Sequence, residues 1–360
     1  MDNLNWEDML RDIADQRAVL FIGQDFLPHT EATIYLDLYK KLMAAGQNGI
    51  DYFYPQDGFF LFTKPSAKSQ AQRNTADFYK NLQPDAALLQ KITEIPFRMI
   101  VNVNPDKSLE KAFLKNAIEP QFDYFTWRPN KKIKEIVEPT SDFPLIYNLF
   151  GSIDHYESLV LDYEDLFDHL KKLLNDENVP EIVRTVLHEA ETYIFLGTRL
   201  EKWYTQLLFR YLNMKENQFD DRNKNYTLKP NFKDDETESF FKKQFNVNYF
   251  GITNEFFNEL HQRYAIYAAE QHNEFPDLSP YRRVERYISE DKTQLALQVL
   301  NAHQHTFSQN DQNALTMLKA NFAMYKKNLT KRALSENELT LAHRQINYAI
   351  LDFSKILPNG

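Results

Sequence analysis

Ala18-Val19-Leu20-Phe21-Ile22-Gly23 is the stretch that decides the fold, because five apolar residues end there in a glycine. A short apolar run that stops at glycine is typical of a buried parallel strand that turns sharply into a helix or loop. Two later runs repeat this pattern, at residues 144–151 and 193–197. The chain has only 8 glycines, so their place after three such runs predicts a shared site. Ligands of doubly wound sheets bind at these carboxyl ends of the strands.

Composition limits the classes of protein that the chain can represent. Its 360 residues are 43% hydrophobic and include 28 Phe and 20 Tyr, enough for two packed domains. The net charge of -9 argues against a general nucleic-acid surface, which is usually basic. Apolar runs are too short to span a membrane and the first residues do not resemble a signal peptide, so we expect a cytoplasmic protein. The absence of cysteine excludes disulfides, thiol catalysis and Cys-ligated zinc.

Strand and helix patterns alternate over most of the chain. Further strands are predicted at residues 97–103, 145–149, 193–196 and 247–252, whereas 51–75 reads as short irregular structure. The alternation predicts an α/β fold with a doubly wound, mostly parallel, Rossmann-like sheet over residues 1–275.

The pattern changes to helix alone after Pro276 and Pro280. Leu315, Leu318, Phe322, Tyr325 and Leu329 repeat at steps of three and four, as in a helix seam. Ser335 and Glu338 form a capping-box pattern that starts the last helix. We therefore predict a separate small all-α bundle at residues 281–357.

The segments taken together resemble the sirtuin-like (Sir2-type) NAD-binding family, especially its members in bacterial antiphage defence. The resemblance covers about residues 15–265 but depends on short motifs. The family's Gly-Ala-Gly-x-Ser corresponds to Gly23-Gln24-Asp25-Phe26-Leu27, and its Thr-x-Asn-x-Asp corresponds to Val103-Asn104-Pro105-Asp106. The His-Gly motif corresponds to Phe150-Gly151, followed by Ser158-Leu159-Val160-Leu161. The family's last motif, Gly-Tyr/Thr-Ser-Leu with an acidic residue before a helix, corresponds to Gly197-Thr198-Arg199-Leu200-Glu201.

The resemblance implies a site for NAD or ADP-ribose and no metal. The residues that it assigns to this ligand are Gly23, Gln24, Asp25, Asn104, Asp106, Phe150, Gly151, Gly197 and Thr198. Protein deacylases of the family usually carry a four-Cys zinc ribbon, which this chain cannot build. Any surviving activity would therefore be NAD cleavage rather than lysine deacylation.

Two positions depart from the family pattern in their chemistry. Asp25 puts a negative charge where a glycine should approach the pyrophosphate, and a pairing with Arg199 would offset that charge. Phe150 replaces the family's histidine and cannot transfer a proton. An active enzyme would use Asn104 together with a base, either His155 from the neighbouring loop or a water.

Local helix chemistry would also account for several of the matching residues. Asn104 before Pro105 fits a helix N-cap with proline in the first turn. Asp106 fits a charge that favours the helix dipole, and Thr198 with Glu201 fits a capping box. His303-Gln304-His305 reads as a solvated helix end rather than a metal clamp.

The last fifth of the chain resembles an effector-associated domain, a helical adaptor of bacterial conflict systems. The resemblance depends on residues 283–288, 296–300, 334–338 and 344–351. It implies a protein partner with a similar domain, which we expect to contact Arg344 and Ile346. Any helical bundle that caps the sheet is the alternative.

Three functions remain open from the sequence. The first is a catalytically eroded sirtuin-like scaffold or signalling component in antiphage defence, recruited through the bundle and assembled as a homo-oligomer. The second is an active NAD hydrolase that a partner or assembly switches on. The third is a binding module without a nucleotide pocket.

Overall fold

The chain folds as two compact units. The computed structural model describes residues 4–129, 131, 135–199, 202–212, 224–229, 235–271, 273–331 and 334–358. The first unit spans residues 1–89, 96–112 and 120–256, and the second spans 90–95, 113–119 and 257–360. The domain limits expected from the sequence, 1–275 and 281–357, remain predictions about which parts fold on their own.

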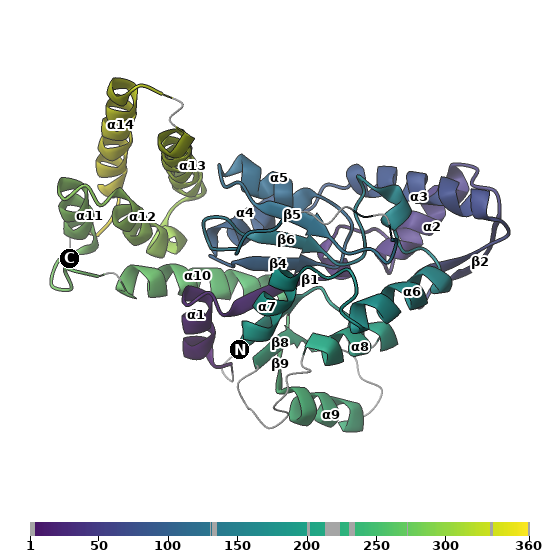
Figure 1. The fold of residues 1–360 in the computed structure, drawn as a ribbon. Helices are drawn as coiled ribbons and strands as arrows, with labels where there is room; N and C mark the ends of the chain where they lie inside the picture. The colour runs from purple at the N-terminus through teal and green to yellow at the C-terminus, as the bar shows by residue number, and fades with distance from the viewer. Residues whose placement is uncertain are drawn as a thin grey trace. The chain divides into compact units, whose positions relative to one another are not determined.

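A parallel sheet of seven strands in the described residues organises the first unit (Figure 1). The strand order is β5-β6-β4-β1-β7-β8-β9, and every neighbouring pair is parallel. The strands are β1 (Ala18–Ile22), β4 (Met99–Asn102), β5 (Gln121–Tyr124), β6 (Leu145–Asn148), β7 (Thr192–Leu196), β8 (Lys224–Leu228) and β9 (Val247–Phe250). The predicted doubly wound α/β fold is confirmed, although the short edge strand β5 was not predicted.

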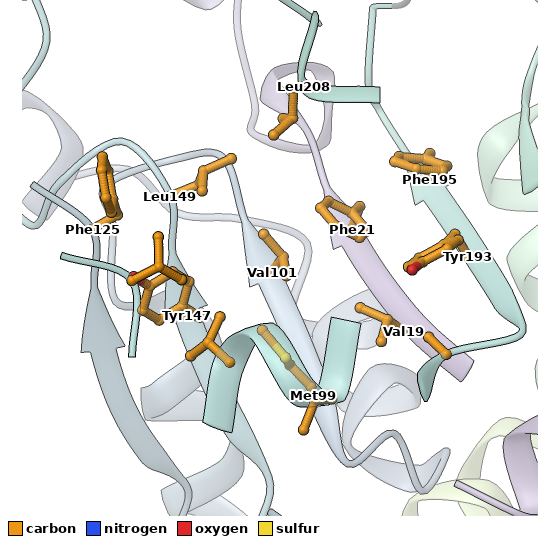
Figure 2. Packing of buried hydrophobic residues seen from close by; sticks show 14 of the residues in the cluster. Val19, Phe21, Met99, Val101, Phe125, Tyr147, Leu149, Tyr193, Phe195 and Leu208 are labelled. Carbon is orange, nitrogen blue, oxygen red and sulfur yellow. The ribbon is translucent and has the colours of Figure 1, made fainter. Parts of the chain in front are cut away.

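The central strands are buried on both faces, which explains their continuous apolar sequence. All five residues of β1 and all five of β7 are buried. Figure 2 shows Val19, Phe21, Val101 and Phe195 in the cluster on one face of the sheet. Phe21 and Phe195 stack there with ring centroids 4.8 Å apart.

Helices cover both faces of the sheet. The cluster of Figure 2 includes buried residues from α6, α7, α8 and α9, and α1 packs against β1 and β7. The helices that belong wholly or partly to the first unit are α1 (Trp6–Ala14), α2 (Ile34–Ala44), α3 (Pro65–Lys80), α4 (Ala86–Glu94), α5 (Ser108–Lys115), α6 (Tyr163–Leu174), α7 (Glu181–Glu189), α8 (Trp203–Leu212), α9 (Asp235–Phe245) and the start of α10 (Thr253–Gln271). Short 3-10 turns, η1 (Gln24–Phe26) and η2 (Tyr156–Ser158), follow β1 and the loop after β6.

Residues 50–80 are ordered, so the expectation of irregular structure over 51–75 is wrong. β2 (Ile50–Tyr54) and β3 (Phe59–Phe62) form an antiparallel hairpin, and α3 follows directly. The hairpin turns at Gly58, whose φ is +83°. Asp-Gly between two aromatic-rich runs is itself a hairpin signal, which the prediction did not use. Packing of Phe60 in a cluster with α2 and α3 fixes the hairpin, and only the folded chain provides that packing.

The second unit is helical, as predicted for the C-terminal bundle. Its helices after α10 are α11 (Pro280–Ser289), α12 (Thr293–Ala302), α13 (Gln309–Lys331) and α14 (Glu336–Ser354), with a short turn η3 (Gln304–Thr306). Leu315 and Leu318 lie in its core, whereas Leu329 at the end of the predicted seam is 49% exposed. The predicted capping box is confirmed, because Ser335 and Glu338 bond to each other's backbone nitrogen.

A buried polar cluster joins three segments inside the second unit. Glu94 pairs with Lys319 of α13 at 2.7 Å and hydrogen-bonds His261 Nε2 of α10 at 2.7 Å. Burial would raise the pKa of Glu94, but the hydrogen bond from His261 and the charge of Lys319 lower it to about 2. The carboxylate is therefore held charged among helices, where its loss would leave buried donors without an acceptor.

Two of the three glycines noted in the sequence meet at the end of the central strands. The strand order reverses between β1 and β7, which is where a doubly wound sheet forms its ligand crevice. A Cβ on Gly23 would lie 2.3 Å from the carbonyl oxygen of Gly197, and a Cβ on Gly197 would lie 2.5 Å from the nitrogen of Phe26. Gly197 also has φ +66°. Both glycines are thus required for the close approach of two turns of the same chain.

Gly23→Ala should lower the free energy of unfolding by about 3 kcal/mol, because the added methyl group overlaps a backbone carbonyl that cannot rotate away. Gly251→Ala is the matched control, since that glycine has open space around it and should change stability by less than about 0.5 kcal/mol. Denaturant unfolding of the full chain measures both. Equal stability of the two variants would contradict the contact between the turns.

Candidate functional site

Four backbone amides of the turn after β1 donate hydrogen bonds within the chain itself. Gly23 N donates to Leu196 O at 2.7 Å, and Asp25 N donates to Gly197 O at 3.0 Å. The next two amides, of residues 26 and 27, donate to carbonyls within the same turn at 3.3 Å. A dinucleotide cradle needs such amides free to approach the pyrophosphate. In this arrangement they already have acceptors.

The charge that Asp25 brings to the turn is balanced by Arg199. Arg199 Nε lies 2.9 and 2.7 Å from the two carboxylate oxygens of Asp25. The pairing that the sequence suggested is therefore present and adds a link between the turns after β1 and β7. Both side chains are about a quarter exposed, so we expect the pair to stabilise the fold by no more than about 1 kcal/mol.

Asn104 connects the end of β4 to the end of β1. The residue is 1% exposed, its Nδ2 donates to Gly23 O at 2.8 Å, and its backbone N donates to Asn102 Oδ1 at 3.0 Å. It is not a helix N-cap, because α5 begins only at Ser108. Asp106 binds the start of the helix instead, since its carboxylate accepts a hydrogen bond from Ser108 N, the first residue of α5, at 2.8 Å. Asn104 is thus placed to hold a neighbouring turn.

Phe150 packs face to face on a histidine that no sequence motif marks. The rings of Phe150 and His169 are 4.7 Å apart and inclined by 5°. His169 lies in α6, is fully buried, and makes edge contacts with Phe125 and Trp127. Burial lowers the pKa of His169 to about 3, against an opposing effect of the Leu149 backbone. The imidazole is therefore neutral at physiological pH and belongs to an aromatic stack.

His155 does not lie beside Phe150 in the cavity. Its side chain is exposed and stacks on Tyr124, with ring centroids 5.2 Å apart. The loop that carries it closes on itself, because Gly151 has φ +90° and a Cβ there would lie 2.3 Å from Ser158 O. His155 and Asn104, expected as a catalytic pair, are thus not brought together around one cavity.

Thr198 lines a small second cavity of about 10 Å³. Its Oγ1 is buried and has no hydrogen-bond partner among the described residues. The predicted partner in a capping box, Glu201, lies outside the described residues, as does Leu200 of the same motif.

The cavity at the ends of β1 and β4 is small. It measures about 40 Å³, and its wall includes Gln24, Asn104 and Phe150 from the predicted site together with Tyr35 and Tyr204. Gln24 Nε2 lies 3.4 Å from Tyr204 Oη across it. Space of this size holds a few water molecules, whereas ligand pockets measure about 300–1,000 Å³. NAD therefore does not fit the residues as they are arranged here.

Tyr35 and Tyr204 were missed as site residues because their positions depend on tertiary packing. Tyr35 comes from α2 and rests on Gly58, where a Cβ would lie 2.3 Å from its ring. Tyr204 belongs to the apolar side of α8 in the sequence. Neither has a local motif, and the hairpin and α8 bring them to the cavity only in the folded chain.

The two expected partner-binding residues lie in different surroundings in α14. Arg344 is exposed, whereas Ile346 is 8% exposed and belongs to the core of the bundle. Among the described residues, no three His, Asp or Glu side chains gather to hold a metal ion. No helix in the described part of the chain is long and apolar enough to cross a membrane.

Comparison with protein families identifies two segments. Residues 98–250 match the SIR2-like domain, and residues 279–358 match effector-associated domain 11. The chain therefore carries a SIR2-like domain followed by an effector-associated domain, as the motifs suggested. SIR2-like domains generally bind NAD. The match begins at β4, so the turn at Gly23 and Asp25 precedes it. No curated protein matches the chain.

His169→Phe should remove a pH dependence of stability. A histidine whose pKa falls from 6.5 to about 3 on folding contributes stability above pH 6.5 that is lost as the pH falls toward 3. Between about pH 7 and about pH 5 this loss amounts to about 2 kcal/mol in the parent chain. Denaturant unfolding at both pH values should show a smaller difference for His169→Phe than for the exposed control His155→Phe. The same difference in both variants would contradict a neutral buried His169.

Proposed function

We propose that this chain is a scaffold or signalling component of bacterial antiphage defence, in which the SIR2-like domain has lost catalysis and the effector-associated domain recruits a partner. The protein would act in the cytoplasm as a symmetric homo-oligomer. The main support for this function is that the Gly23 and Asp25 amides donate hydrogen bonds to carbonyls of the chain itself. Donors that already have strong acceptors offer little gain to an incoming phosphate.

The chemistry beside the turn supports the same function. Phe150 supplies no proton-transfer group, and its ring stacks on the buried His169. Asn104 is the one residue that matches the family motif well, and its side-chain amide already donates a hydrogen bond to Gly23 O. Both side chains are thus engaged by contacts within the chain, which is consistent with a scaffold.

Purified full-length protein should release no nicotinamide from NAD, either alone or after forced assembly on a fused oligomerisation tag. The reason is that a 40 Å³ cavity must enlarge several-fold before the ligand can enter. Chromatography of released nicotinamide measures the activity, and Asn104→Ala serves as the comparison variant. Turnover that Asn104→Ala abolishes would overturn the scaffold function.

An NAD hydrolase activated by a partner is the second candidate. It is favoured by the polar groups that converge on the cavity, namely Gln24, Asn104, Tyr35 and Tyr204. Thr75 adds a buried hydroxyl without a hydrogen-bond partner among the described residues. If assembly parts the turns after β1 and β7, these groups would line a larger cleft.

The exposed side of α14 is the surface on which we place partner recruitment. Leu341 is 58% exposed and Tyr348 is 73% exposed, one on each side of Arg344 along the helix. Large apolar side chains this exposed, next to a cation, are typical of contact residues in protein interfaces. Ile346 is excluded from this surface because it supports the core.

Arg344→Glu and Tyr348→Asp should each abolish co-purification with a partner that bears a similar effector-associated domain. Charge reversal and the loss of an aromatic anchor typically reduce affinity by about 30-fold, roughly 2 kcal/mol. Arg282→Glu on α11, also exposed, is the control and should bind normally. Thermal unfolding checks that the bundle remains folded. Unchanged co-purification of folded variants would argue against recruitment through α14.

A further inference from the structure

A second and larger hollow lies in the first unit. Its volume is about 510 Å³, within the range of small-molecule sites, and it shares no lining residue with the cavity at β1 and β4. The hairpin strand β3 lines one part of it, and the first turns of α3 and α6 line the rest, together with Arg128 from the loop after β5. We call it the hairpin groove.

Hydrogen bonds and ion pairs fix the walls of the hairpin groove. Phe60 N donates to Leu161 O at 2.8 Å, which joins β3 to the segment before α6. Lys68 of α3 pairs at 2.6 Å with Asp162, the N-cap of α6, and at 2.8 Å with Asp165 in the first turn of that helix. The groove is thus built from elements that are already bound to one another. Ligand binding would therefore cost little conformational entropy of the protein.

Positively charged side chains line the hairpin groove. Arg128 Nε donates to the carbonyl of Glu157 at 2.6 Å, and its two terminal nitrogens have no acceptor among the described residues. Lys64 is exposed at the N-terminus of α3, where no side chain caps the helix. Lys68 is occupied by its two aspartates, and Glu164 is the remaining acid in the wall. Lys64 at an uncapped helix start and Arg128 in the same wall favour an anionic group, above all a phosphate.

Aromatic and amide groups lie in the same wall as these cations. Tyr54 and Tyr163 line the groove with ring centroids 5.1 Å apart at an angle of 70°. Gln72 is 3% exposed and donates through Nε2 to Leu159 O at 3.1 Å. Gln72 therefore adds a polar side-chain amide to the wall.

We propose that the hairpin groove binds a nucleotide, with the phosphate at Lys64 and Arg128 and the base against Tyr54 and Tyr163. A phosphate alone would leave the aromatic wall and Gln72 unused. A nucleotide supplies a flat ring, exocyclic polar groups and an anion in one molecule. This site is independent of the proposed function of the SIR2-like crevice, since no lining residue is common to the two.

Titration calorimetry of the full-length protein tests the site with AMP, ADP, ATP, GMP and CMP, and with adenosine and inorganic phosphate as fragments. At least one nucleotide should bind more tightly than either fragment. Lys64→Gln and Arg128→Gln should each weaken that binding about tenfold, as expected for a lost charged hydrogen bond. Tyr54→Leu should weaken it as well, because the ring contact is lost.

Lys80→Gln is the matched control, because Lys80 is an exposed lysine at the opposite end of α3 and should bind like the parent. Thermal unfolding shows that each variant is folded. No nucleotide binding at about 1 mM would overturn the site, as would inorganic phosphate binding as tightly as the nucleotide. Binding that Asn104→Ala weakens and Lys64→Gln does not would place the ligand in the crevice instead and would also overturn it.

Discussion

The closure of two backbone turns against each other is the constraint on which the rest of the first unit depends. Gly23 and Gly197 approach so closely that neither position has room for a Cβ. The approach lets Gly23 N and Asp25 N donate across the point where the strand order reverses. In a nucleotide-binding fold, glycine at these turns admits a phosphate. Here the same residue type admits the neighbouring turn.

The contacts of the side chains around the closed turns depend on this closure. Asp25 pairs with Arg199, and Asn104 donates to the carbonyl of Gly23. Phe150 rests on a neutral histidine inside the aromatic cluster. A site built for a dinucleotide would leave such groups partly free. Their mutual pairing is the reason that we propose a scaffold function rather than catalysis.

Much of the fold could be read from local sequence, because burial of a parallel strand on both faces demands an uninterrupted apolar run. The strands at Val19, Ile100, Ile146 and Ile194 were predicted for that reason. The hairpin at residues 50–62 and the edge strand β5 were not, since both are short and depend on packing or on a partner strand. His169 was missed because a buried histidine within an amphipathic helix has no distinguishing spacing.

The sequence by itself determined the doubly wound sheet, the helical bundle and the positions of Gly23, Gly197 and Asn104 at strand ends. These depend on periodicity and on residue type, which are local properties. Only the tertiary structure decided what the glycines approach, which side chain faces Phe150, and that Ile346 is core while Arg344 is surface. Those contacts join residues far apart in the chain, and their partners are set by packing across elements rather than by any local pattern.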